Sequence, residues 1–289
     1  MAITASMVKE LRERTGLGMM DCKRALEETG GDLEQAIEEL RKKSALKAAK
    51  KAGRITANGL LGLKVSEDRE RAAMVEVNIE TDFAAKNEKF IAFVQKTVGL
   101  VFDSESGDIS TVLEAGLDAE RETLVQEIGE NISVRRAILV TSDSGGISAY
   151  LHGDKRKASL VILSGQNNEL GRDIAMHVTA INPLVVRSDE VPEDVLAKER
   201  EIYTTQADDS GKPAEIVEKM VEGRVRKYLA EVSLVDQPFV KDPSQKVGTL
   251  ANSAGVEVER FVRYEVGEGI EVAEEDFAAE VAAQLNDSA

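Results

Sequence analysis

The stretch from residue 72 to residue 101 constrains the fold most, because its hydrophobic pattern changes from that of a strand to that of a helix. Residues 72–77 form a short, apolar and partly β-branched run, which is typical of a buried strand. Further on, apolar residues and one threonine recur at three- and four-residue spacing, which indicates one helix face: Phe90, Phe93, Val94, Thr97, Val98 and Val101. The polar stretch 78–86 is therefore predicted to be a loop between a strand and a helix, a position at which proteins commonly display functional residues.

Phe83 is the unusual residue of this loop, because it is a large apolar ring flanked by Asp82 and Lys86. Burial of such a ring stabilises a fold by roughly 1.5–3 kcal/mol. This favours a hydrophobic staple at the start of the helix, with Asp82 as the N-cap. The other interpretation is a ring kept for the pocket of a partner protein, with an acidic neighbour that steers it. The residues alone leave both interpretations open.

The N-terminal 54 residues are predicted to form a small unit of three helices. Thr4 or Ser6 can cap the first helix, Gly16 can end it, and Asp32 can cap the third. The lysine- and alanine-rich run 41–54 is expected to continue the third helix into a semi-rigid linker. Because so short a unit buries too little apolar surface to be very stable alone, we interpret it as a docking module.

After this unit the pattern changes to strands, so that the whole chain is predicted to have an α+β fold. Residues 59–65 and 72–78 are predicted to form a hairpin around a polar turn at 66–71. The turn at 142–146 is expected to join strands 132–141 and 147–151 as a second hairpin. Both pairings would build antiparallel sheets.

Two segments of the central region are weakly similar to each other. Residues 74–78 and 160–164 are both apolar strands followed by a loop and a helix, which suggests two related α+β subdomains. Two helices of similar length, at about 192–207 and 214–232, are predicted to form an antiparallel hairpin with an exposed apolar stripe. The predicted units are therefore 1–54, 55–141, 142–270 with the hairpin 191–233 inserted, and a C-terminal helical module at 271–289.

Composition and charge exclude several classes of function. The net charge of −16 argues against a duplex nucleic-acid binder, although residues 1–54 carry twelve Lys/Arg against nine Asp/Glu, a net charge of +3. The single cysteine, Cys22, excludes an intramolecular disulfide and fits a reducing cytoplasm. Neither a signal peptide nor an apolar run long enough to span a membrane is visible.

The sequence also lacks the patterns of a catalytic or metal site. Its only histidines, His152 and His177, do not lie in a metal-ligand spacing, and we interpret His177 as a structural residue. Neither a phosphate-binding P-loop nor a dinucleotide fingerprint is present, and a nucleophile motif does not stand out. We therefore expect neither enzymatic activity nor a cofactor.

Four stretches of this sequence resemble the bacterial elongation factor Ts family, the nucleotide exchange factors of elongation factor Tu. They follow one another along the whole chain: Leu11-Arg12-Glu13-Arg14-Thr15-Gly16-Leu17-Gly18-Met19-Met20-Asp21-Cys22-Lys23-Arg24-Ala25-Leu26, Glu76-Val77-Asn78-Ile79-Glu80-Thr81-Asp82-Phe83-Ala84-Ala85-Lys86, Gln237-Pro238-Phe239-Val240 and Tyr264-Glu265-Val266-Gly267-Glu268-Gly269-Ile270-Glu271. The sequence departs from the family pattern at Ile79, where a small or polar residue is usual, and at Ala84, where valine is usual.

The resemblance implies a fold and a set of site residues. The fold would comprise a three-helix N-terminal domain similar to the ubiquitin-associated domain, two related core subdomains, the inserted hairpin and the C-terminal module. The residues that would displace the magnesium ion of the partner are Thr81, Asp82, Phe83 and Ala84. Those that would bind the partner elsewhere are Arg12, Met19, Met20, Lys23, Ile128, Gly129 and His152. On physical grounds Met19 and Met20 could equally well fill the core of the N-terminal unit.

The implied partner is elongation factor Tu, with GDP bound or free of nucleotide, and nucleic acid and membranes are not implied as partners. In some members of the family the hairpin is a dimerisation element, so that a homodimer or a heterotetramer with the partner is possible here. A rival hypothesis is a translation-associated docking or holdase protein without exchange activity. That hypothesis explains the N-terminal helices and the hairpin but not the Asp82-Phe83 loop.

Overall fold

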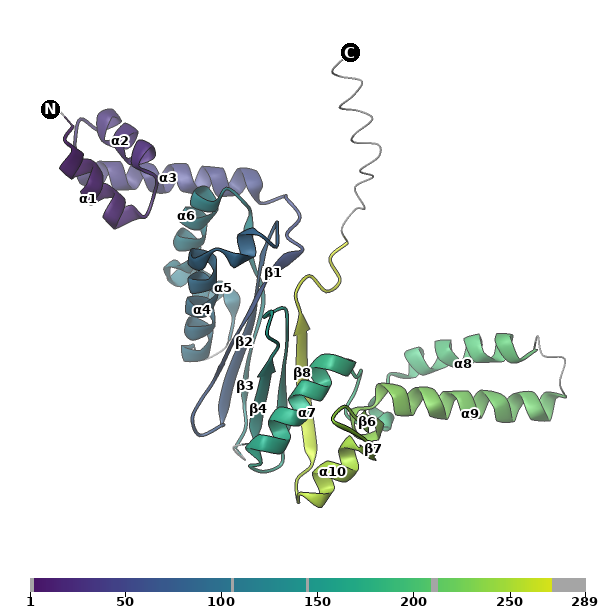
Figure 1. Cartoon of the computed structure of the whole chain (residues 1–289). Coiled ribbons are helices and arrows are strands. Elements are labelled where there is room, and N and C mark those ends of the chain that lie inside the picture. Colours follow the sequence, from purple (N-terminus) through teal and green to yellow (C-terminus); the bar gives the residue numbers. More distant parts are fainter. Residues whose placement is uncertain (1–2, 105–106, 144–145, 209–212, 272–289) are drawn as a thin grey trace, which may run out of the picture.

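The structure is a computed structural model that describes residues 3–104, 107–143, 146–208 and 213–271. Figure 1 shows a small helical unit at the N-terminus, a central body with two sheets, and a long helical hairpin that projects from the body. Helices and antiparallel strands occur together throughout the body, which confirms the predicted α+β class. The predicted C-terminal module 271–289 lies almost entirely outside the described residues.

The N-terminal unit consists of α1 (Ala5–Thr15), α2 (Met19–Glu28) and α3 (Leu33–Lys51). Thr4 caps α1 by accepting a hydrogen bond from the Met7 N–H, and Asp32 caps α3 by accepting one from the Gln35 N–H. Gly16 ends α1 in the left-handed conformation, as predicted. The unit has its own small core: Val8, Leu11, Leu17, Cys22, Ala25, Leu26, Ala36 and Leu40. Helix α3 continues beyond this core toward the body, in agreement with the prediction that residues 41–54 extend the third helix (Figure 1).

The first sheet has the strand order β1 (Asn58–Val65), β2 (Arg71–Ile79), β3 (Ile132–Thr141), and all its pairings are antiparallel. Helices α4 (Glu88–Asp103) and α6 (Asp118–Ile128) cover its outer face. The chain between β2 and β3 also forms three shorter elements: η1 (Ala84–Lys86), α5 (Ile109–Val112) and η2 (Leu113–Leu117).

The second sheet repeats this arrangement with the order β4 (Ile147–Leu151), β5 (Lys157–Leu163), β8 (Val258–Glu265), again antiparallel. Helices α7 (Asn168–Ile181) and α10 (Val247–Ser253) cover its outer face. The remaining short elements are η3 (Ser188–Glu190), η4 (Leu234–Asp236), β6 (Pro238–Phe239) and β7 (Asp242–Lys246).

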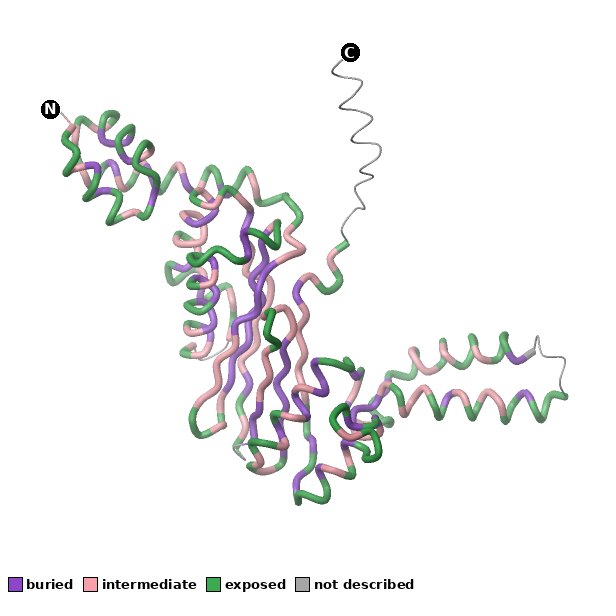
Figure 2. Tube along the Cα trace, viewed as in Figure 1, coloured by how far each residue is buried: buried purple, intermediate pink, exposed green. Residues whose placement is uncertain are grey.

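The two sheets pack on each other, so that the body has the layers helix, sheet, sheet, helix. One hydrophobic cluster joins β2 to α4 and α6, a second joins β5 to α7 and α10, and a third lies between the sheets. Alternate residues of β2 therefore point to different cores: Val75 toward α4, Met74 toward the second sheet. Burial on both faces explains why β2 and β5 are apolar runs rather than alternating patterns (Figure 2).

The predicted hairpin between 132–141 and 147–151 is wrong. Strand β3 pairs with β2 in the first sheet, whereas β4 pairs with β5 in the second. The segment between them crosses from one sheet to the other, and a turn-like sequence alone cannot distinguish this crossing from a hairpin.

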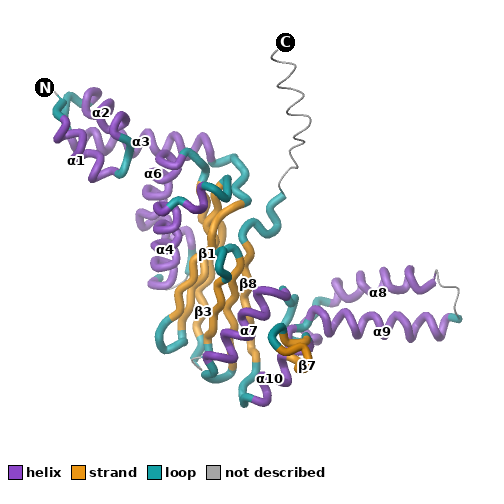
Figure 3. The backbone as a smooth tube through the Cα atoms, in the orientation of Figure 1, coloured by secondary structure: helices purple, strands orange, loops and turns teal. Residues whose placement is uncertain are grey.

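The inserted hairpin consists of α8 (Glu193–Asp208) and α9 (Ala214–Val232), which lie antiparallel and project from the second sheet (Figure 3). Arg224 connects the two helices by donating a hydrogen bond to Gln206 and by lying over the ring of Tyr203. Ile202 and Ile216 remain about half exposed. Within the described residues, no helix is both long and apolar enough to span a membrane.

Candidate functional site

The loop after β2 is held in place by its own hydrogen bonds and by the turn that precedes β3. The Thr81 hydroxyl donates to Glu130 (2.8 Å) and accepts from the Ala84 N–H (3.1 Å), while the Thr81 N–H donates to the other Glu130 oxygen (2.9 Å). A carboxylate that accepts two hydrogen bonds from one residue restricts the loop strongly. The loop is therefore a fixed feature of the surface.

Phe83 lies exposed on this loop. Its side chain is 83% exposed, more than any other large apolar side chain in the described part of the chain, while the adjacent Ala84 and Ala85 are buried against α4. Exposure of a phenylalanine forgoes the stabilisation that its burial would bring. In the isolated chain the ring is thus available to another molecule.

The staple interpretation of Phe83 is wrong. The N-cap of α4 is Asn87, whose side chain accepts a hydrogen bond from the Lys89 N–H. Asp82 instead forms an ion pair with Lys86 (3.0 Å), and this contact lowers the pKa of the Asp82 carboxyl below its usual value. Asp82 is consequently an exposed carboxylate next to an exposed ring.

The turn at Ile128-Gly129 lies beside this loop, since Glu130 follows it directly. Gly129 ends α6 with φ of +88°, its carbonyl accepts a hydrogen bond from Lys51 of α3, and Ile128 is partly buried against the first core. Asn131, two residues after Gly129, donates its N–H to Glu80 (2.6 Å). Three of the stretches singled out in the sequence, at 51, 80–84 and 128–131, thus meet at one end of the first sheet.

Met19 and Met20 form a separate surface on the N-terminal unit. Their side chains are 57% and 67% exposed, so the core-filling interpretation is wrong. They line an apolar depression of about 360 Å³, together with Arg12 and Lys23. Exposed methionines make an adaptable contact surface, and the cations around them would suit an acidic partner.

His152 lies on the turn between β4 and β5 and lines a hollow of about 450 Å³ with Tyr150, Met176 and Val240. Its ring nitrogen Nδ1 is 3.3 Å from the Tyr150 hydroxyl. The same turn reaches the first sheet: Arg156 donates to the Asn58 side chain (3.1 Å), which in turn donates to the carbonyl of Glu80 (3.0 Å). Polar contacts therefore connect the His152 turn to the base of the Phe83 loop.

His177 is a structural residue, as predicted. It lies on α7 and is fully buried against the segment 237–240, with Nε2 2.8 Å from Gln237 and Nδ1 accepting from the Val240 N–H (3.1 Å). Burial lowers the pKa of His177 despite the opposing effect of Gln237, so that the ring is neutral at pH 7. Gln237 and Val240 of the Gln-Pro-Phe-Val stretch thus hold His177 in place.

The sequence reasoning missed the polar residues that support the loop, among them Glu80, Glu130, Asn131 and Asn58. The sequence gives no local signal of this role for Glu130, because its contact with Thr81 spans 49 residues. In the described residues, no group of three or more His, Cys, Asp or Glu side chains is arranged to hold a metal ion.

The comparisons with known proteins agree with the four motif stretches. Residues 80–268 match the family model described as elongation factor TS. The chain belongs to the elongation factor Ts family. It is 61% identical to elongation factor Ts of Hahella chejuensis over 98% of this chain and 99% of that protein. Corresponding values are 57%, 99% and 98% for Saccharophagus degradans, and 54%, 100% and 99% for Cellvibrio japonicus.

Membership of the elongation factor Ts family places the chain among the elongation factors of protein biosynthesis. The two departures from the family pattern, Ile79 and Ala84, are both buried in the first core. They therefore affect the support of the loop rather than the surface that Asp82 and Phe83 present.

Proposed function

We propose that this protein is a guanine nucleotide exchange factor of elongation factor Tu, and that the loop at Thr81, Asp82, Phe83 and Ala84 carries the activity. The observation that supports this most directly is the exposure of Phe83 on a loop held by Glu130. An exposed ring on a fixed support loses little conformational entropy when it enters a pocket.

The proposed mechanism acts on the magnesium site of the partner. A P-loop GTPase holds its nucleotide through backbone amides, a lysine and a magnesium ion that Ser/Thr and Asp side chains coordinate. Insertion of Phe83 between helices near this site, with polar contacts from Asp82, would move the groups that hold the ion. GDP would then bind more weakly without being contacted itself.

Thermodynamic linkage gives this mechanism a quantitative consequence. The factor by which the exchange factor weakens GDP binding equals the factor by which GDP weakens binding of the exchange factor. A tight complex is therefore expected only with nucleotide-free elongation factor Tu, whereas the GDP-bound form makes a transient encounter.

Three further surfaces would hold the partner while the loop acts. These are the Met19-Met20 depression with Arg12 and Lys23, the turn at Ile128 and Gly129, and the hollow beside His152. We propose that the chain acts in the cytoplasm as a binding protein rather than an enzyme, without a cofactor. The hairpin 191–233 would join two copies of the chain, or two complexes, through its exposed apolar side chains.

The proposed units of the chain remain 1–54, 55–141 and 142–270.

The alternative function, a docking or holdase protein, draws support from the exposed methionines of the N-terminal unit. It gives no role to a ring that is held outward at residue 83, and we favour nucleotide exchange for that reason.

Release of fluorescent GDP from purified elongation factor Tu tests the proposal. The wild-type chain should accelerate release, and Phe83→Ala should lose most of this acceleration while keeping its fold, with a smaller loss in Asp82→Ala. Equal acceleration by all three proteins would support nucleotide exchange but contradict the assignment of the activity to the Asp82-Phe83 loop. If the wild type does not accelerate release, the docking alternative stands.

A further inference from the structure

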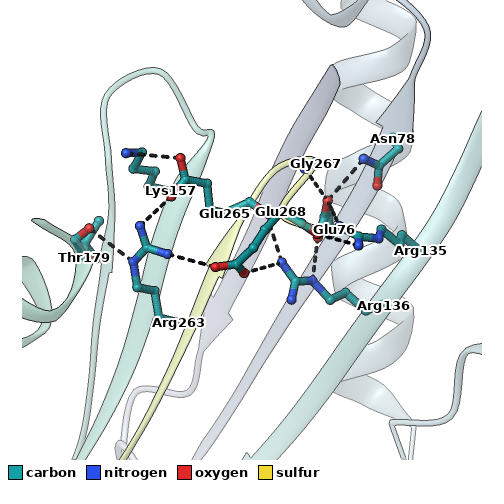
Figure 4. Close-up of polar contacts among 10 residues, drawn as sticks. All are labelled: Glu76, Asn78, Arg135, Arg136, Lys157, Thr179, Arg263, Glu265, Gly267 and Glu268. Atoms are coloured by element: carbon teal, nitrogen blue, oxygen red, sulfur yellow. Dashed lines mark hydrogen bonds and ion pairs between the residues drawn. The ribbon is translucent and has the colours of Figure 1, made fainter. Parts of the chain in front are cut away.

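Glu76 is a carboxylate buried completely between the two sheets. Both its oxygens are bound: Oε1 accepts from Arg135 (3.1 Å), from Asn78 (3.1 Å) and from the Gly267 N–H (2.8 Å), and Oε2 accepts from Arg136 (2.5 Å). Figure 4 shows these groups converging on the carboxylate from β2, from β3 and from the turn after β8. The position lies on the β2 face that otherwise carries Ala72 and Met74.

A β-bulge brings two consecutive arginines to the same carboxylate. Glu76 pairs with Arg136 and Val77 with Val134, so that Arg135 is an extra residue in β3. Neighbouring residues of a regular strand point to opposite faces, and a bulge changes this locally. The bulge therefore lets both guanidinium groups approach the face between the sheets.

The polar network extends from Glu76 across the second sheet. Arg136 also binds Glu268 (3.2 Å), which binds Arg263 (3.5 Å). Arg263 binds Glu265 (2.6 Å), which also binds Lys157 (3.1 Å), where the series ends (Figure 4). The carbonyl of Lys157 accepts the His152 N–H at 2.9 Å. A continuous series of ion pairs thus connects β2 with the turn that carries His152.

The backbone of the turn after β8 fits closely into this arrangement. Gly267 has φ of +79°, and a Cβ atom there would lie 2.3 Å from the carbonyl oxygen of Ala57. Only glycine allows this approach, which places the Gly267 N–H on Glu76. The turn therefore contacts both the carboxylate and the residue that precedes β1.

We propose that Glu76 is a positioning residue for nucleotide exchange: it holds the Asp82-Phe83 loop and the His152 turn at one fixed separation, so that both engage the partner together. This rests on the proposed function. Three elements that carry candidate contacts meet at Glu76. Strand β2 continues from Glu76 to the loop, β3 follows the Ile128-Gly129 turn, and Gly267 connects Glu76 to the second sheet.

A simple stabilising role would not require charged residues here. Apolar side chains of similar volume often replace a buried ion-pair network without loss of stability, because the charges must be desolvated. A network of directional hydrogen bonds does, however, define one arrangement of the two sheets, whereas an apolar contact between sheets permits small shifts. The two roles can therefore be separated experimentally.

The first measurement is structural and independent of exchange activity. Spin labels on Glu88→Cys and Gly153→Cys report the separation of the loop end and the His152 turn; both sites are exposed, and Cys22 is buried. We expect a single narrow distance distribution in this background and a broader or shifted one after Glu76→Gln. An unchanged distribution would overturn the proposal.

The second measurement is the rate of GDP release from elongation factor Tu as a function of exchange-factor concentration. Glu76→Gln should lower the maximal rate by about 10-fold or more, because a misplacement of a positioned group by about 1 Å can cost up to roughly 100-fold, while the concentration for half-maximal effect changes less. The matched control is Glu120→Gln, which removes an exposed ion pair with Lys96 and should leave the rate unchanged.

A combined variant separates positioning from stability. Glu76→Met with Arg135→Met and Arg136→Met removes the charges together and should be more stable than Glu76→Met alone, which leaves both arginines without their buried anion. If it also exchanges GDP at the wild-type rate, the positioning role is wrong. If the wild type itself fails to accelerate release, the proposed function is wrong, whereas the distance measurement still decides whether Glu76 fixes the two sheets.

Discussion

The two sheets of the body share a topology but differ in the residues that matter for function. Each consists of a hairpin and a third strand that pairs with the second strand of that hairpin, and each has a bulge near the end of this pairing, at Glu76/Val77 and at Ile162/Leu163. Each central strand leads through a loop to a helix on the outer face. The scaffold is thus repeated although the sequences are only weakly similar.

The differences lie at two equivalent places. The first sheet has Glu76 at its bulge where the second has Ile162, and its loop displays Phe83 whereas the loop after β5 ends in Asn167, the N-cap of α7. Both sheets bury their central strand, so the scaffold does not require a charge or an exposed ring. The comparison shows that the first sheet and its loop carry features beyond those needed for folding.

Making the first sheet like the second should have the largest effect on stability. Glu76→Ile leaves Arg135 and Arg136 without their buried anion, and removal of one partner from a buried ion pair typically costs about 3–5 kcal/mol. Urea unfolding followed by circular dichroism measures this loss. The control Ile162→Val in the second sheet should cost about 0.5–1.5 kcal/mol; an equally small loss for Glu76→Ile would contradict our account of the network.

Removing the ring from the first loop should affect binding and leave stability unchanged. Phe83→Ala is expected to weaken the complex with nucleotide-free elongation factor Tu by about 2–4 kcal/mol, the range of a dominant interface residue. Since the ring is exposed, the free energy of unfolding should change by less than about 0.5 kcal/mol. Titration calorimetry gives the affinity. Leu184→Ala, which truncates an exposed apolar side chain outside the loop, serves as the control. Equal losses of affinity in both variants would contradict the assignment of Phe83 as an interface residue.

A buried histidine distinguishes the second half from the first, which contains none. Because burial lowers the pKa of His177, the unfolded chain binds the proton more readily, and the stability due to neutral His177 is present above the unfolded pKa of about 6.5. It should be lost as the pH falls below that value, by up to about 1.4 kcal/mol per pH unit. Unfolding at pH 7.5 and 5.5 tests this, and His177→Gln should flatten the dependence; an unchanged slope would argue against it.

Loosening the support of the first loop should have the smallest effect. Thr81→Val removes the hydroxyl that contacts Glu130 and the Ala84 N–H, and loss of such hydrogen bonds costs about 1 kcal/mol. GDP release should slow several-fold, less than with Phe83→Ala. Thr111→Val at an exposed position is the control. A loss as large as that of Phe83→Ala would mean that Thr81 contacts the partner itself.

Much of the fold could be predicted because it depends on neighbouring residues. The caps at Thr4 and Asp32 follow from side-chain contacts with residues three positions away, and the end of α1 at Gly16 follows from its left-handed backbone and its N–H bond to the carbonyl of Arg12. The strand-to-helix change between 72 and 101 follows from periodicity. The candidate site residues were also visible, although their assignment came from motif resemblance rather than from physical pattern.

Tertiary structure decided what the sequence left open. Phe83 is exposed on a loop whose Thr81 is held by Glu130, 49 residues further along the chain. Strand β3 pairs with β2 and not with β4, because β4 belongs to the second sheet. The surroundings of Glu76 depend on a bulge in β3 and on the N–H of Gly267, 191 residues away. The sequence by itself determined the local elements and the presence of an acidic, aromatic loop. Long-range packing and hydrogen bonding determined its exposure and support, since residues far apart in the chain leave no periodic trace of their contact.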